Sequence, residues 1–275
     1  MTQLMTGVVT VELKDHVADV RLNRPDKMNA IDPAMWKAIS AAGDLLAETR
    51  GVRAVVLSGN GRSFCAGMDM ATFQSIGDST TSRSGKPNLD TKAGGARPGN
   101  SFQRAALVWK RLPVPVIAAL HGVAFGAGAQ IALGADIRIA GPDLRFSILE
   151  IKWGLIPDVG ISQTLRDVVP LDVAKELTFT GRILQADEAR SLGLVTRIAE
   201  DPIGQAMALA REVASKSPDA IRLGKQLLDE SWHADEASGL ALEAGLQSKL
   251  IGSENQLEAI RANFEKREPK FKDPG

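Results

Sequence analysis

The sequence has few cysteines and no net charge, and both properties exclude whole classes of protein. It contains a single cysteine, Cys65, which excludes an intramolecular disulfide and a cysteine-rich zinc site and is typical of a reducing compartment. Its 33 basic and 33 acidic residues cancel, so no overall field attracts nucleic acid or an anionic membrane. Any anionic ligand must therefore be bound by local groups.

Long apolar runs and several well-known motifs are also missing. No stretch reaches the roughly 18 uninterrupted apolar residues of a membrane span. There is no GxxxxGK(S/T) or GxSxG motif, and GAGAQI has isoleucine where a dinucleotide-binding GxGxxG motif has its third glycine. The three histidines, His16, His121 and His233, lie far apart and predict no metal site. We expect a cytoplasmic protein that binds neither nucleic acid, nor a metal ion, nor a membrane.

What is present indicates an α/β fold. Residues 8–13 and 17–22 alternate apolar and polar side chains around a Lys14-Asp15 turn, which predicts a hairpin. Asp32-Pro33 predicts the cap of a helix that ends near Glu48. Further along, the pattern predicts buried strands at 53–59, 115–120 and 136–140, and a helix near 101–112. Strands separated by helices need crossover connections, so we expect a largely parallel sheet.

The composition changes twice along the chain. Residues 76–100 are rich in Gly, Ser, Thr, Pro and Lys without apolar periodicity, so we expect a flexible insertion, either a tolerated surface loop or the rim of a ligand cleft. From residue 170 onward the pattern predicts helices at 171–179, 186–192, 201–215, 218–231 and 235–264. We therefore expect a core of residues 1–198 and a helical region of residues 199–275, which covers the core or mediates subunit contact.

Two segments share the order strand, small-residue turn, helix start. They are VVLSGNGRSFCAGMDM (55–70) and VIAALHGVAFGAGAQIALGAD (116–136). Small residues let a ligand approach the backbone closely, and the start of a helix leaves N–H groups without internal partners. One such turn alone usually serves packing. Two of them predict a pair of converging amides that can hold one oxyanion.

Five blocks of the sequence resemble, in order and in spacing, the signature blocks of the crotonase superfamily, the enoyl-CoA hydratase and isomerase group. They are NRPDKMNAI (23–31), SGNGRSFCAGMDM (58–70), AALHGVAFGAGAQIALGADIRIA (118–140), FSILEIKWGLIPDVG (146–160) and LTFTGRILQADEARSLGLV (177–195). The resemblance implies a crotonase-type spiral of ββα units with a C-terminal helical trimerisation region, and assembly into homotrimers or hexamers. It also implies acyl-CoA thioester substrates, with coenzyme A as part of the substrate and no separate cofactor.

The resemblance assigns the oxyanion hole to two main-chain N–H groups, those of Met68 and Ala127. The second position is more often glycine in the family, but alanine keeps the N–H. Six further residues match substrate-binding positions: Met28, Ala30, Ala66, Gly67, Asp69 and Gly126. Asp69 also has a structural interpretation, as the cap of a helix that begins there.

Three polar positions are candidates for proton transfer. Where the family commonly carries two glutamates used in hydration, this chain has Gln130 and Glu150. Glutamine can orient a water molecule but cannot exchange a proton near neutral pH. Asp158 follows Glu150 by eight residues, as in members that resemble dienoyl-CoA isomerases, although a dehalogenating relative uses a carboxylate near this position as a nucleophile. The resemblance makes Glu150 the general base and acid.

Several functions are compatible with the sequence. Double-bond isomerisation is preferred because it fits one firm carboxylate, Glu150, together with Asp158. Enoyl-CoA hydration is the alternative, with Gln130 and Asp158 orienting water for Glu150. A non-catalytic acyl-CoA-binding member and a dehalogenase that uses Asp158 are further alternatives. Acyl chain length, pathway, trimer against hexamer, and a contact of the basic residues 264–272 with coenzyme A are not determined by the sequence.

Structural interpretations accompany the functional ones. Glu150 and Asp158 can cap or pair at a surface turn, and Gln130 can be a buried amide whose hydrogen bonds are satisfied. Asp136 follows a run of small residues, and we expect it to be a hydrogen-bond acceptor at the start of its strand.

Overall fold

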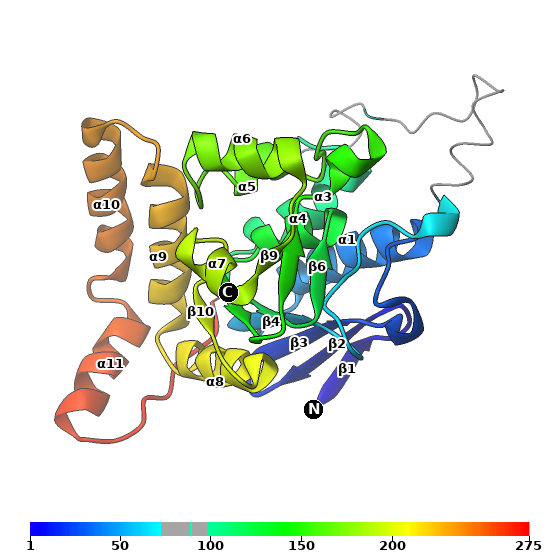
Figure 1. Ribbon diagram of the computed structural model, residues 1–275. Coiled ribbons are helices and arrows are strands. Elements are labelled where there is room, and N and C mark those ends of the chain that lie inside the picture. Colours follow the sequence, from blue (N-terminus) through cyan, green and yellow to red (C-terminus); the bar gives the residue numbers. More distant parts are fainter. Residues whose placement is uncertain (73–88, 90–97, 275) are drawn as a thin grey trace.

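The computed structural model describes residues 1–72, 89 and 98–274 (Figure 1). Its centre is a seven-stranded sheet with helices on both faces. The strands in spatial order are β1 (Thr2–Met5), β2 (Val9–Lys14), β3 (Val17–Leu22), β4 (Ala54–Gly59), β5 (Val116–Leu120), β7 (Ile137–Ala140) and β10 (Arg197–Ile198). The flexible insertion expected at 76–100 lies largely outside the described residues.

The sheet begins as an antiparallel meander and continues as parallel strands. The predicted hairpin is confirmed, because Lys14 of β2 pairs with Val17 of β3. Asp15 and His16 have positive φ angles of 49° and 66°, as a tight two-residue hairpin turn requires. The neighbouring pairs from β3 to β10 are all parallel, which confirms the expected largely parallel sheet. Strand β1, which was not predicted, pairs with β2.

Helices cover the two faces of the sheet unequally. On one face lie α1 (Pro33–Glu48), α3 (Ser101–Lys110) and α4 (Ala127–Leu133), and on the other lies α8 (Pro202–Ala214). The helix α1 begins as predicted, since Asp32 Oδ1 accepts the N–H of Met35 at 2.8 Å. Val55 and Leu57 face the first group of helices, while Val56 faces α8. Burial on both faces explains why β4 is apolar throughout.

A smaller sheet brings distant segments together and was not predicted. It contains β6 (Val123–Phe125), β8 (Arg145–Ser147) and β9 (Leu184–Gln185), with β6 parallel to β8 and β8 antiparallel to β9. The N–H of Gly126 donates to the carbonyl oxygen of Ser147 at 2.9 Å, so the start of α4 lies beside the chain that leads into η4 (Glu150–Trp153). The remaining short elements are η1 (Pro25–Lys27), α5 (Ile161–Thr164), α6 (Leu171–Thr180) and α7 (Ala186–Ser191).

The C-terminal part of the chain is helical, as expected, with one correction. After α8 come α9 (Pro218–Ser231), α10 (Glu236–Leu250) and α11 (Glu254–Phe264), and α9 packs against α10 (Figure 1). The prediction of one helix over 235–264 is wrong. Gly252 has a φ of 79°, and the side chain of Ser253 accepts the N–H of Gln256 at 3.3 Å to cap a new helix. No helix of the described residues is both long and apolar enough to cross a membrane.

Two largely buried cations join this helical part to the sheet. Lys225 of α9 places Nζ 2.7 Å from Oδ2 of Asp136, which also accepts the N–H of Val116 at 2.7 Å. The prediction that Asp136 is a hydrogen-bond acceptor at the start of its strand is therefore confirmed. Next to β4, Arg53 donates to Oδ1 of Asp273 at 2.7 Å and to two main-chain carbonyls.

Candidate active site

The two small-residue bends lie against each other. The N–H of Cys65 donates to the carbonyl oxygen of Val123 at 3.0 Å, and the N–H of Phe125 donates back to Cys65 at 3.0 Å. A Cβ atom added at Gly67 would lie 2.8 Å from the carbonyl oxygen of Phe125 and 3.9 Å from the nitrogen of Ala127. Gly67 also has a φ of 90°, so only glycine permits this approach of the two backbones.

The N–H groups of Met68 and Ala127 are among those in these bends that have no acceptor within the described residues. Ala127 is the first residue of α4, where a helix cannot supply a partner for the N–H. On either side of Met68, the carbonyl of Gly67 and the N–H of Asp69 bond to Ile31, and the N–H of Met68 is left out of this pairing. Within the described part of the chain, neither the Met68 nor the Ala127 N–H donates a hydrogen bond. Both predicted donors are available to a ligand.

Residues 28–31 form a wall beside the first bend. The N–H of Ala66 donates to Met28 at 2.9 Å, and the N–H of Ile31 donates to Gly67 at 2.8 Å. Met28 has a φ of 49°, and the left-handed conformation turns the chain into this parallel pairing. The structure thus gathers the residues predicted to bind substrate into one region: Met28, Ala30, Ala66, Gly67, Asp69 and Gly126.

Arg24 fixes this wall, although sequence analysis did not single it out. Its guanidinium donates to the carbonyl oxygen of Ala30 and to Oδ2 of Asp69, the latter at 3.0 Å. Asp69 also accepts the N–H of Ala71 at 3.0 Å, which confirms its expected capping role. The N–H of Ala71 and the Arg24 guanidinium hold the pKa of Asp69 below its ordinary value. The position of Arg24 inside the NRPDKMNAI block was the signal that could have identified it.

The neighbouring Asn29 fastens the wall to the first bend from inside the protein. Its buried Nδ2 donates to the carbonyl oxygens of Ser63 and Phe64 at 2.8 and 3.1 Å. A Cβ atom at Gly59 would lie 2.7 Å from this nitrogen, so the end of β4 must be glycine. Asn29 therefore shapes the site without facing it.

Glu150 begins η4 directly beside the second bend. A Cβ atom added at Gly126 would lie 3.2 Å from Oε1 of Glu150. Oε1 accepts a hydrogen bond from Nε2 of Gln130 at 2.6 Å. The other oxygen, Oε2, is buried and has no hydrogen-bond partner among the described residues. Burial raises the pKa of Glu150, and the negative charge of Asp158 raises it further. The hydrogen bond from Gln130 lowers this pKa.

Gln130 is fully buried in α4 and connects two segments of the site. Its Oε1 accepts the N–H of Val159 at 2.8 Å, while its Nε2 donates to Glu150. Both ends of the amide are therefore engaged with the protein, which agrees with the expectation of a satisfied buried amide. The Val159 contact could not be predicted, because it joins residues on separate elements through a main-chain N–H.

Asp158 lies next to Val159 on the surface of the protein. Removal of part of its hydration raises the pKa of Asp158, and its charge acts on Glu150. The three polar residues predicted from the sequence, Gln130, Glu150 and Asp158, thus form one group beside Gly126.

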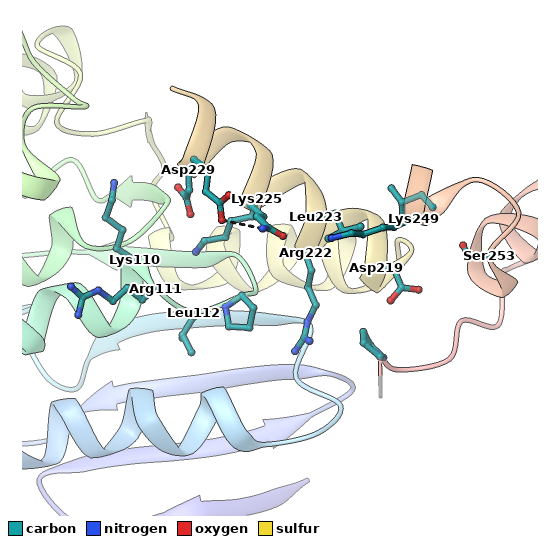
Figure 2. Close-up of a pocket in the computed structure, with 15 residues that line it drawn as sticks. Lys110, Arg111, Leu112, Asp219, Arg222, Leu223, Lys225, Asp229, Lys249 and Ser253 are labelled. Atoms are coloured by element: carbon teal, nitrogen blue, oxygen red, sulfur yellow. Dashed lines mark hydrogen bonds between the residues drawn. The ribbon is translucent and has the colours of Figure 1, made fainter. Parts of the chain in front are cut away.

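A separate cavity of about 760 Å³ lies between α9, the loop after α3 and the segment that joins α10 to α11 (Figure 2). Its lining includes Lys110, Arg222, Lys225, Asp229 and Lys249, and none of the predicted site residues. Throughout the part of the chain that the structure describes, no group of three or more His, Cys, Asp or Glu residues is placed to hold a metal ion.

Comparison with known proteins identifies the family of this chain. A sequence profile described as Enoyl-CoA hydratase/isomerase matches residues 12–274. The chain belongs to this family, the crotonase superfamily. Short-chain-enoyl-CoA hydratase of Clostridium acetobutylicum is 32% identical to this crotonase over 262 residues, which are 94% of the chain and 95% of the relative. Human mitochondrial Delta(3,5)-Delta(2,4)-dienoyl-CoA isomerase is 34% identical over 265 residues, 93% of the chain and 78% of the relative.

Solved structures agree with this family. The crystal structure of enoyl-CoA hydratase from Bacillus anthracis matches this crotonase with a TM-score of 0.83 at 29% sequence identity, over 97% of the chain and 99% of that protein. The predicted crotonase-type fold is therefore confirmed, and the protein is an enzyme of the crotonase family. Its relatives include both a hydratase and an isomerase, so their names alone do not select a reaction.

Proposed function

We propose that this crotonase moves a carbon-carbon double bond in an acyl-CoA thioester, with coenzyme A as part of the substrate and no separate cofactor. One observation carries the proposal. The carboxylate of Glu150, whose Oε2 has no hydrogen-bond partner in the described residues, lies beside Gly126, the residue before the unpaired N–H of Ala127. A base and an oxyanion donor placed so close together suit the removal of a proton next to a thioester carbonyl.

The proposed reaction uses one carboxylate twice. The thioester oxygen accepts hydrogen bonds from the N–H groups of Met68 and Ala127. Glu150 takes a proton from the carbon next to the thioester carbonyl, and the electron pair of the broken C–H bond is delocalised onto that oxygen. Glu150 then returns the proton to another carbon of the same system, the double bond shifts, and the carboxylate is restored. Each oxyanion donor contributes about 3 kcal/mol to such a step.

The environment of Gln130 supports isomerisation over hydration. Hydration requires a water molecule to be oriented and deprotonated in addition to the proton delivered to carbon. The amide of Gln130 is already bonded to Glu150 and to Val159, and an amide does not exchange protons near neutral pH. Isomerisation needs only one carboxylate, and Glu150 can both accept and return the proton.

Enoyl-CoA hydration is the second candidate, and Asp158 favours it. Asp158 is exposed and lies close enough for its charge to raise the pKa of Glu150. In that reaction Asp158 orients water for Glu150, with Gln130 holding the base.

The test offers the purified protein a 3-enoyl-CoA, a 3,5-dienoyl-CoA and a 2-enoyl-CoA. Isomerisation changes the conjugation measured by absorbance at constant mass, whereas hydration adds the mass of one water. We expect isomerisation, reduced roughly 1000-fold by Glu150→Gln. Fast hydration with slow isomerisation would select the second candidate. Thioester binding without turnover would identify a non-catalytic member, and halide release with an acyl-enzyme at Asp158 would identify a dehalogenase.

We also propose that residues 1–198 form the catalytic core, and that residues 199–275 take part in assembly into a homotrimer or hexamer. Exposed large apolar side chains support this assembly, because subunit contacts bury such surface. On α6, Leu171 and Phe179 are 69% and 68% exposed, and in the helical region Trp232 and Phe264 are 67% and 86% exposed. Light scattering on the full chain tests the proposal, and a monomer at micromolar concentration contradicts it.

A further inference from the structure

We propose that Gln130 is a positioning residue, which holds Oε1 of Glu150 and thereby reserves Oε2 as the oxygen that moves the proton. This inference rests on the proposed role of Glu150 in proton transfer and deepens it. It assigns the reacting atom and gives Gln130 a role other than holding water.

Oε1 of Glu150 is occupied on two sides. Nε2 of Gln130 donates to it at 2.6 Å. Gly126 lies on a second side, so close that a Cβ atom added there would lie 3.2 Å from Oε1. An oxygen that already accepts a short hydrogen bond is a weaker base, so proton transfer falls to the other oxygen.

Oε2 has the opposite environment. It is buried, and no group among the described residues donates a hydrogen bond to it. A buried, unpaired carboxylate oxygen is costly and rare in folded proteins, and such atoms are associated with catalytic roles. The substrate proton is the partner that this oxygen lacks.

The orientation of the Gln130 amide is fixed by the main chain. The N–H of Val159 can only donate, so the atom that faces it at 2.8 Å must be the amide oxygen of Gln130. The NH₂ group is therefore directed at Glu150 and donates at every pH. A rotated amide would set its NH₂ against an N–H and its oxygen against a carboxylate.

The same side chain joins the two carboxylates of the site. Gln130 ties Glu150 to Val159, the residue that follows Asp158. Asp158 is the charged residue whose field acts on Glu150, and the uncharged Gln130 is the side chain that donates to it. Besides burial, which has the largest effect on the pKa of Glu150, Gln130 and Asp158 therefore act on its proton affinity from one connected arrangement.

The decisive experiment measures the titration of Glu150 directly in the full chain. Protein labelled with carbon-13 at Cδ of glutamate is titrated by NMR, and the Glu150 signal is assigned by its loss in Glu150→Gln. Gln130→Met keeps the length of the side chain and removes its hydrogen bonds. We expect the Glu150 midpoint to rise by about one pH unit, because the ionised form loses a donor. Gln205→Met, an exposed position on α8, is the matched control and should leave the midpoint unchanged.

A second variant keeps the inference testable if Gln130→Met does not fold. Gln130→Glu preserves size and polarity but places a second carboxyl 2.6 Å from Glu150. Two carboxyls so close titrate as a coupled pair, with one step well above the wild-type midpoint. The rising limb of kcat/KM with pH should follow the NMR midpoint in both variants, which a purely structural role would not produce.

The outcomes separate this inference from the proposed function. A folded Gln130→Met protein with an unchanged Glu150 midpoint overturns the positioning role. If the midpoints move as expected but no acyl-CoA is isomerised or hydrated, the proposed function fails and the contact between Gln130 and Glu150 keeps its effect on proton affinity.

Discussion

Gly67 and Ala127 meet where the two bends touch: a Cβ atom on the first residue would lie 3.9 Å from the main-chain nitrogen of the second. Because of this contact, the proposed oxyanion donors, the N–H groups of Met68 and Ala127, belong to two adjacent stretches of backbone. Because both donors are main-chain atoms, ordinary side-chain substitutions leave them in place. Experiments must therefore change the backbone itself.

Ala127→Pro removes one proposed donor and places the ring Cδ where that hydrogen was. Proline is well tolerated at the first position of a helix, where the N–H has no partner in the helix. We expect kcat to fall by about 100-fold to 1000-fold, as for loss of one oxyanion donor in other enzymes. Steady-state kinetics with the preferred enoyl-CoA measures the effect.

Ala127→Gly is the matched control, because glycine keeps the N–H and removes only the methyl group. We expect near wild-type kcat and equal melting temperatures for the three proteins. Full activity in a folded Ala127→Pro protein would remove this N–H from the mechanism.

Asp158→Asn should move the acid limb of the pH profile. The carboxylate form of Glu150 accepts the proton, so kcat/KM rises with pH through the pKa of Glu150. Burial and then the charge of Asp158 raise that pKa above its ordinary value of 4.5. Removing the charge lowers the pKa, and the limb shifts to lower pH. A shift to higher pH, measured with the same substrate, contradicts the assignment of Glu150 as the base.

Glu150→Gln should stabilise the fold at neutral pH while abolishing turnover. A carboxyl whose pKa is raised by folding binds its proton more tightly in the native state, so its ionised form destabilises the protein. This penalty is absent below the unfolded pKa, grows between the unfolded and the folded pKa, and is complete above the folded pKa. Urea unfolding should therefore show a gain for the variant at about pH 8 and little difference at about pH 4. Equal stability of the wild-type protein and the variant at about pH 8 would contradict a Glu150 carboxylate that is destabilised by burial.

Lys225→Met tests the connection between α9 and the sheet. The side chain of Lys225 is 8% exposed, and its ammonium group bonds to Asp136, which among the described residues would keep the N–H of Val116 as a partner. We expect a loss of about 2 kcal/mol in unfolding free energy, less than the roughly 3–5 kcal/mol of a fully buried broken pair, because Asp136 is partly hydrated. The exposed Lys216→Met is the matched control, and calorimetry on both variants gives the comparison. Equal melting temperatures for the two would show that the ion pair contributes nothing measurable.

Local signals made much of the fold predictable. The strand and helix patterns up to residue 140 gave correct elements because both faces of the sheet are buried, and the Asp32-Pro33 cap marks its helix start unambiguously. The helix over 235–264 failed at Gly252, where a glycine followed by a capping serine interrupts a pattern that is apolar on both sides. The short strands β6, β8 and β9 contain two or three residues each, too few for any periodicity to appear.

The candidate site was predictable only as far as a family resemblance reaches. Gln130, Glu150 and Asp158 were selected from their positions in motifs, and the structure places them together. The bond of Gln130 to Val159 and the clamp by Arg24 depend on which backbone atoms are left unpaired after folding. No sequence pattern encodes such a contact, because any residue type supplies a main-chain N–H or carbonyl.

The hydrogen bond between Arg53 and Asp273 joins residues 220 positions apart. Closing a loop of that length is entropically unfavourable, so we expect this contact to form late in folding. Until the contact forms, the guanidinium group of Arg53 stays in water, and the end of β4 beside it stays hydrated. We expect formation of the hydrogen bond between Arg53 and Asp273 to be the slowest refolding phase of this enzyme. It should be detectable as delayed protection of the main-chain amides around residue 54 from hydrogen exchange.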